Sequence, residues 1–112
     1  MEVKPVGDAL SSLEDQYIFL TNHLDDYLTA CKTDAERDSV TSNYVKSRRN
    51  YWNCINKIFH DDDPRVGAVV EQMGAAQKSL EGSLAQLDQI ATVLNTIASA
   101  VKVGGDLAAL AG

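Results

Sequence analysis

A hydrophobic residue recurs at every seventh position over the second half of this 112-residue sequence. The series consists of Val66, Met73, Leu80, Leu87, Leu94 and Val101. A seven-residue repeat places these side chains along one face of an α-helix and is typical of coiled coils. Asp63 and Pro64 are favourable residues for a helix start, and Gly104-Gly105 is typical of a helix end. The pattern predicts one long helix over about 64–103, followed by a short tail over 104–112.

A second interpretation places a break near Gly82. Glycine lowers helix stability, and Ser83 and Gln86 have the spacing of a capping box. A break here would give four helices instead of three. The hydrophobic spacing continues from Leu80 to Leu87 without a change of phase, and this favours the single helix.

The first half of the sequence predicts two more helices. Apolar residues at spacings of three and four predict the first helix, over about 8–32. Thr33 and Glu36 have capping-box spacing and predict a second helix over about 34–59. The short connection between the two predicts an antiparallel hairpin. We therefore expect an all-α fold in one domain over 1–112, a helical hairpin plus a long C-terminal helix. This is a three-helix bundle, or a four-helix bundle if the chain breaks near Gly82.

The predicted helices differ in length. At 1.5 Å per residue, the first two would each be about 38 Å long and the third about 60 Å. The excess leaves an apolar segment projecting beyond the hairpin, and monomers rarely expose such a patch. Either the chain bends back over this segment, or a second chain covers it. We expect that a second copy of the chain covers it, which makes the protein a homo-oligomer. Its expected self-association surface consists of Leu80, Leu84, Leu87, Ile90, Leu94, Ile97 and Val101.

Basic and aromatic residues are interleaved on the predicted second helix. One interpretation pairs the basic residues with acids of the first helix, namely Asp15, Asp25 and Asp26. Another is a protein-binding surface, because arginine and tryptophan are enriched at interface hot spots. Sixteen acidic against ten basic residues give a net charge of −6, which argues against nucleic acid as the partner. The expected partner-binding residues are Arg48, Arg49 and Trp52, and the expected partner is a protein.

The sequence contains no pattern typical of a catalytic, cofactor-binding or metal site. His60 precedes three aspartates on a helix-to-helix turn, where successive side chains cannot all reach one ion. Cys54 has no neighbouring histidine or carboxylate to activate its thiol. No phosphate-binding glycine loop or nucleophile elbow is present. We expect a protein that is not an enzyme and that uses no cofactor or metal.

The N-terminal residues lack the pattern of a signal peptide, and the apolar stretch from Ile90 to Ala111 is too interrupted by polar residues to predict a transmembrane helix. Cys31 and Cys54 are expected about 30 Å apart, too far for a disulfide. These features favour the cytoplasm, with secretion without a signal peptide as an alternative.

The function expected from the sequence is protein interaction or assembly, for example as an adaptor, a chaperone or an immunity-type inhibitor. The alternative is a secreted effector or membrane-active component that releases its apolar C-terminal helix. Membrane-surface helices usually carry several basic residues beside the apolar face, whereas the stretch over 66–102 contains only Lys78 and Lys102. A membrane partner is therefore not expected.

Overall fold

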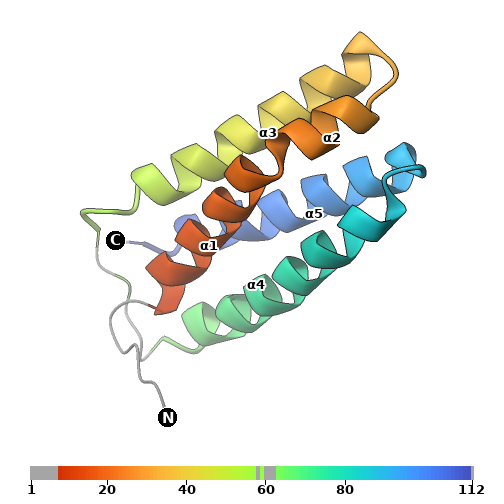
Figure 1. Cartoon of the computed structure of the whole chain (residues 1–112). Coiled ribbons are helices and arrows are strands. Elements are labelled where there is room, and N and C mark those ends of the chain that lie inside the picture. Colours follow the sequence, from red (N-terminus) through yellow and green to blue (C-terminus); the bar gives the residue numbers. More distant parts are fainter. Residues whose placement is uncertain (1–7, 58, 60–62, 112) are drawn as a thin grey trace.

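The computed structural model describes residues 8–57, 59 and 63–111, and all regular structure in these residues is helical. The expected all-α class is confirmed. Five α-helices pack together, and a short 3-10 helix, η1, lies between the last two (Figure 1). The elements are α1 (Asp8–Asn22), α2 (Leu24–Ala30), α3 (Asp34–Trp52), α4 (Pro64–Ser83), η1 (Leu84–Gln86) and α5 (Ile90–Ala108).

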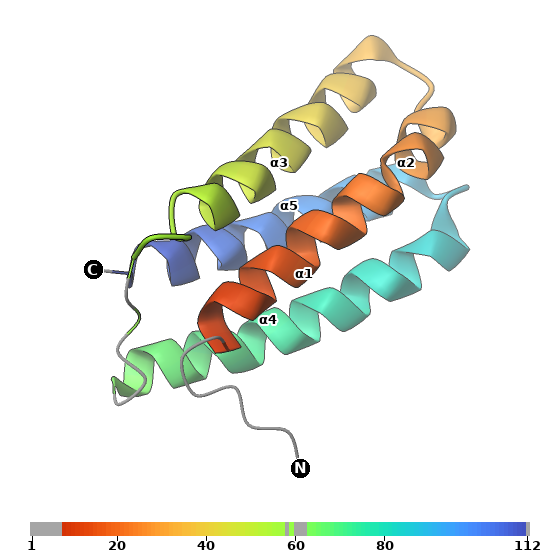
Figure 2. The same cartoon turned by 60° about the vertical axis from the view of Figure 1, so that its left-hand side comes forward.

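The first predicted helix is present as two shorter helices, α1 and α2, which follow one another with an interruption at His23. The interruption is slight, because the His23 backbone N–H donates to the Phe19 carbonyl and the His23 carbonyl accepts from the Tyr27 N–H, both at 3.1 Å. Both helices lie beside α3, which runs back along them (Figures 1 and 2).

α3 begins where the sequence predicts and ends earlier. Thr33 and Glu36 form the expected capping box, in which the Glu36 N–H donates to Thr33 Oγ1 and the Thr33 N–H donates to Glu36 Oε1, both at 3.1 Å. The helix ends at Trp52 instead of near residue 59. After Trp52 the chain continues in turns, which lead to the buried side chains of Cys54 and Phe59.

The prediction of one continuous helix over 64–103 is wrong. α4 begins at Pro64 as predicted, with the Asp63 side chain accepting from the Arg65 N–H at 2.9 Å. It continues through Gly82 and ends at Ser83, and after η1 the chain reverses and α5 lies along α4 (Figure 2). The predicted end at residue 103 is also wrong, because Gly104 and Gly105 lie inside α5.

Burial of apolar side chains explains the reversal. The described part of the molecule measures 44 × 26 × 20 Å, so no helix of about 60 Å projects from it. α5 packs against α1, α3 and α4 instead, and so its apolar face is buried. Each fully buried aliphatic side chain contributes roughly 1.5–3 kcal/mol relative to an exposed one. Several such side chains on α5 outweigh the backbone hydrogen bonds lost at the turn.

The interior consists of two clusters of buried residues. The first core cluster contains Leu20, Tyr27, Cys31, Val40, Leu80, Ile90, Val93, Ile97, Ala100 and Val101. The second core cluster contains Ala9, Leu13, Cys54, Phe59, Val66, Met73 and Leu107. The buried side chain of Gln16 lies between Leu13 and Leu20 on α1, where the two clusters meet, and its Nε2 donates to the Ala100 carbonyl of α5 at 2.8 Å.

Candidate functional site

The seven residues predicted to mediate self-association belong to the interior of a single chain. Four of them are at most 7% exposed and lie in the first core cluster: Leu80, Ile90, Ile97 and Val101. The other three are partly buried and pack against the same cluster: Leu84, Leu87 and Leu94. Because the chain bends back over this face, the projecting apolar segment does not exist. Self-association through these residues therefore stays a prediction, without the projecting segment that motivated it.

The residues predicted to bind a partner lie together on the solvent-exposed side of α3, near its C-terminal end. Trp52 is three residues from Arg49 and four from Arg48, which are the separations of neighbours on a helix surface. All three side chains are exposed, and 62% of Trp52 is accessible to solvent. Together with Asn53 they line a surface depression of about 350 Å³. The sequence-predicted residues thus form one continuous surface.

Ile55 extends this surface beyond the end of α3. It is 41% exposed, and its backbone N–H donates to the Trp52 carbonyl at 3.4 Å, which places it one turn further along the chain. The large hydrophobic residues exposed in the described part of the chain are Ile18, Trp52 and Ile55. Two of these three, Trp52 and Ile55, therefore lie within the seven residues that follow Arg48 in the sequence. We call Arg48, Arg49, Trp52, Asn53 and Ile55 the Arg–Trp surface.

The basic residues of α3 do not pair with acids of the preceding helices. Among the described residues, the ion pairs join His23 to Asp26, Arg37 to Asp34, Arg65 to Asp63 and Lys102 to Asp106. The predicted contacts of the α3 bases with Asp15, Asp25 and Asp26 are not found among these. Four of the ten basic residues and none of the sixteen acids lie between positions 39 and 60. The Arg–Trp surface therefore carries positive charge that this segment does not neutralise.

Aromatic contacts join α1 to α3 in place of ion pairs. The ring centroid of Tyr17 lies 5.9 Å from those of both Tyr44 and Tyr51. Tyr51 Oη donates to Glu14 Oε2 at 2.7 Å, and this bond to a carboxylate raises the pKa of the Tyr51 phenol. Of the aromatic residues interleaved with the α3 bases, Trp52 is the exposed one, since Tyr44 and Tyr51 are partly buried.

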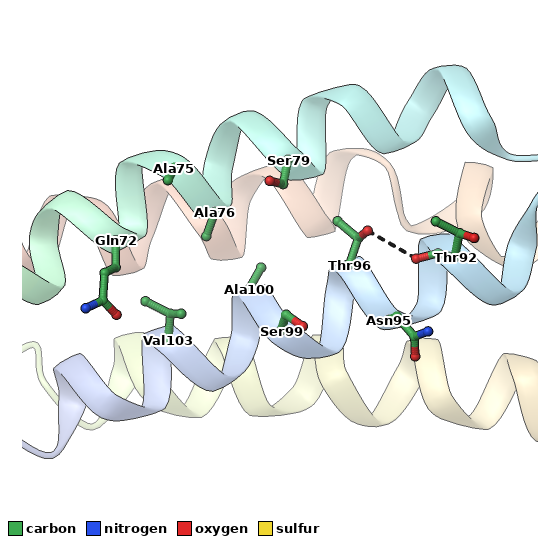
Figure 3. Close-up of a pocket in the computed structure, with 10 residues that line it drawn as sticks. All are labelled: Gln72, Ala75, Ala76, Ser79, Thr92, Asn95, Thr96, Ser99, Ala100 and Val103. Carbon is green, nitrogen blue, oxygen red and sulfur yellow. Dashed lines mark hydrogen bonds between the residues drawn. The ribbon is translucent and has the colours of Figure 1, made fainter.

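A groove of about 410 Å³ runs between α4 and α5 (Figure 3). Its ten lining residues are all uncharged, and most are alanine, serine or threonine. The Thr96 hydroxyl donates to the Thr92 carbonyl of its own helix at 3.1 Å. Among the described residues that line the groove, there is no histidine, cysteine or carboxylate that could activate one of its hydroxyls as a nucleophile.

Titratable groups elsewhere do not assemble into a reactive centre within the described residues. No group of three or more histidine, cysteine or acidic residues there could hold a metal ion. Cys31 and Cys54 are free, and burial raises the pKa of both thiols, which disfavours the reactive thiolate. The run from His60 to Asp62, considered above as a metal-binding candidate, lies outside the described residues.

No family model, curated protein or solved structure matches this chain. In the described part of the chain, no helix is both long enough and apolar enough to span a bilayer.

Sequence reasoning missed Asn53 and Ile55. The predicted second helix extended to residue 59, whereas the helix ends at Trp52 and Ile55, which follows it, is 41% exposed. A signal that marks this region is present in the sequence: residues 39–60 contain no acid, although the whole chain carries a net charge of −6.

Proposed function

We propose that this chain is a non-enzymatic helical protein-binding module, whose partner docks on the Arg–Trp surface. The observation that carries the proposal is the exposure of Trp52, at 62%, beside two arginines without an ion-pair partner among the described residues. Tryptophan and arginine are the residue types most enriched among interface hot spots.

The exposed indole offers a sizeable binding energy. A partner that covers it would remove roughly 100–150 Å² of mostly apolar surface from water, which is worth about 3 kcal/mol before the costs of association are subtracted. Arg49 also has a local role, because a positive charge in the last helical turn offsets the negative end of the helix dipole. This role does not account for the exposure of Trp52 or Ile55.

An adaptor, a chaperone or an immunity-type inhibitor would each use a surface of this kind. We do not extend the proposal to self-association through the seven residues expected to form the self-association surface, because those residues already pack within one chain. Nor does any observation favour the membrane-active alternative, since release of α5 would expose the centre of the first core cluster.

Affinity capture with matched variants tests the proposal. The wild-type chain, Trp52→Ala and Ile18→Ala would be immobilised and exposed to extract from the source cells. Ile18 is a suitable control because it is 45% exposed but lies on α1. We expect proteins that are retained by wild type and Ile18→Ala and lost with Trp52→Ala. If all retained proteins bind the three chains equally, the Arg–Trp surface is not the docking site.

A further inference from the structure

The Arg–Trp surface combines two chemical features that together restrict its partner. Its charge comes from Arg48 and Arg49. The acid-free segment over 39–60 also contains Lys46 and Lys57. Its apolar part comes from Trp52 and Ile55, which are 62% and 41% exposed. A complementary surface must therefore supply negative charge and an apolar group side by side.

The form of the positive charge favours carboxylates. A guanidinium group presents a planar fork of donors that matches a carboxylate in a two-bond arrangement. Both arginines line the depression of about 350 Å³ in which the indole also lies. A segment with acidic side chains could thus contact the arginines while an adjacent aliphatic or aromatic side chain covers Trp52.

Two observations disfavour nucleic acid, which also carries negative charge. Binding of single strands usually requires aromatic rings on which successive bases stack, but Tyr44 and Tyr51 of α3 pack against Tyr17. In addition, the net charge of −6 repels a polyphosphate at long range.

From this combination we infer that the partner presents an acidic segment with an apolar side chain next to its carboxylates. The inference rests on the proposed function and adds the chemistry of the partner to it. Recognition depends on electrostatic attraction for encounter and orientation, and on burial of Trp52 for affinity. Binding is therefore strongly weakened by salt, because the arginines are exposed and screened by ions.

Trp52 provides a built-in reporter, because it is the only tryptophan in the chain. The probe is a synthetic peptide of glutamate and leucine, which has no fluorescence of its own in the tryptophan range. Two control probes are the same peptide with glutamine in place of glutamate, and an oligouridylate. Each would be titrated while Trp52 emission is followed, at about 0.05 M and about 0.5 M NaCl.

We expect the glutamate peptide to shift the Trp52 emission to shorter wavelength and to bind at least about tenfold more weakly at the higher salt. The double variant Arg48→Glu, Arg49→Glu should lose this binding. The matched variant Lys78→Glu, which reverses an exposed charge on α4, should retain it. Circular dichroism would verify that both variants are folded.

Iodide and caesium quenching of Trp52 gives a second measurement that needs no peptide. Relative to a free tryptophan amide, the neighbouring arginines should raise the ratio of iodide to caesium quenching in the wild type, and the double charge reversal should lower this ratio. If the ratio in the wild type is no higher than that of the free tryptophan amide, the indole does not lie in a positive field and the inference fails.

The outcomes separate the inference from the proposed function. Equal binding of the glutamine peptide, without salt dependence, would overturn the acidic-partner inference and leave a protein-binding surface in place. Tighter binding of the oligouridylate would overturn the inference and favour nucleic acid. Absence of binding by the glutamate peptide would also overturn it, whereas the proposed function would still be decided by the capture experiment.

Discussion

Substitution of Gly104 by alanine tests how α1 packs against α5. Gly104 is buried, and an added Cβ would lie 2.7 Å from Gln16 Oε1 and 3.3 Å from Asn50 Nδ2. The Gln16 side chain is 1% exposed, and its Nε2 donates to the Ala100 carbonyl at 2.8 Å. Its Oε1 has no hydrogen-bond partner within the described residues. A methyl group at position 104 must therefore displace a buried amide that is held by a single bond.

Two opposing contributions determine how much Gly104→Ala changes the free energy of unfolding. Alanine stabilises a helix interior by about 1 kcal/mol relative to glycine. None of the described glycines has a positive φ, so the substitution adds no backbone strain. Displacing the Gln16 amide leaves a buried polar group unpaired, at a cost of about 1–3 kcal/mol, and forces its side chain from a favourable rotamer at about 1 kcal/mol more. We expect Gly104→Ala to lower the free energy of unfolding by about 1–3 kcal/mol.

Gly74→Ala is the matched control on α4. An added Cβ at Gly74 has no atom within 4 Å, so only the gain in helix propensity remains. This variant should be about 0.5–1 kcal/mol more stable than wild type. Urea denaturation followed by circular dichroism measures both changes, and the midpoint of Gly104→Ala should decrease by about 1 M at an unchanged slope.

A double-mutant cycle identifies the contact. Gln16→Ala removes the amide that the new methyl group would meet, so Gly104→Ala should be much less harmful in that background. The opposite result would be that Gly104→Ala stabilises the wild-type chain as much as Gly74→Ala does. Gln16 would then not lie against Gly104, and the packing of α1 on α5 would differ from that described above.

Three further predictions follow from burial. Ile97→Glu should lower the free energy of unfolding by about 4 kcal/mol or more, because it buries an unpaired charge, whereas Ala98→Glu on the exposed side of α5 should be tolerated. Light scattering and circular dichroism check this, and a folded monomeric Ile97→Glu variant of an oligomeric wild type would instead favour self-association. Burial raises the pKa of Tyr27, so the folded chain keeps this proton to higher pH than the unfolded chain. The free energy of unfolding should therefore fall as pH rises above about 10, and less so in Tyr27→Phe, which urea titrations across this range would measure. Cys31 and Cys54 should react with an aromatic disulfide reagent only after unfolding, and fast reaction of either thiol in the native protein would contradict its burial.

Helix starts were the most predictable features of the fold. The Thr33–Glu36 capping box and the Asp63–Pro64 start involve hydrogen bonds between residues within a few positions of each other. Such bonds depend little on the remainder of the chain, so the residue types alone identify them.

The candidate site was only partly predictable. Arg48, Arg49 and Trp52 share a helix face because of their spacing, and that much follows from sequence. Whether that face is exposed depends on which side of α3 packs against α1 and α5, and the aromatic contacts of Tyr17 with Tyr44 and Tyr51 contribute to this choice. The outward position of Ile55 depends on the helix ending at Trp52, which the hydrophobic spacing does not indicate.

The buried hydroxyl of Ser83 illustrates how the tertiary structure decides between two local patterns. In the sequence, Ser83 is a polar residue within the seven-residue hydrophobic repeat. The hydrophobic spacing continues unchanged from Leu80 to Leu87, and this favours a continuous helix. In the structure, Ser83 is the last residue of α4, donates to the Leu80 carbonyl at 2.6 Å and is 2.8 Å from Tyr27 Oη. Tyr27 belongs to a helix more than fifty residues earlier, so this partner cannot be found from the neighbouring sequence.

Three properties could be predicted from the residues alone: the chain is helical, α3 and α4 begin at their capping residues, and α5 has an apolar face that must be covered. These properties depend on residue spacing and on hydrogen bonds within a turn or two. What covers that face depends on contacts between helices that are far apart in the chain. A chain that reverses after Ser83 and a partner chain that docks on a straight helix would bury the same side chains. Here the reversal buries them against α1, α3 and α4 of the same chain, without the loss of translational freedom that a second chain requires.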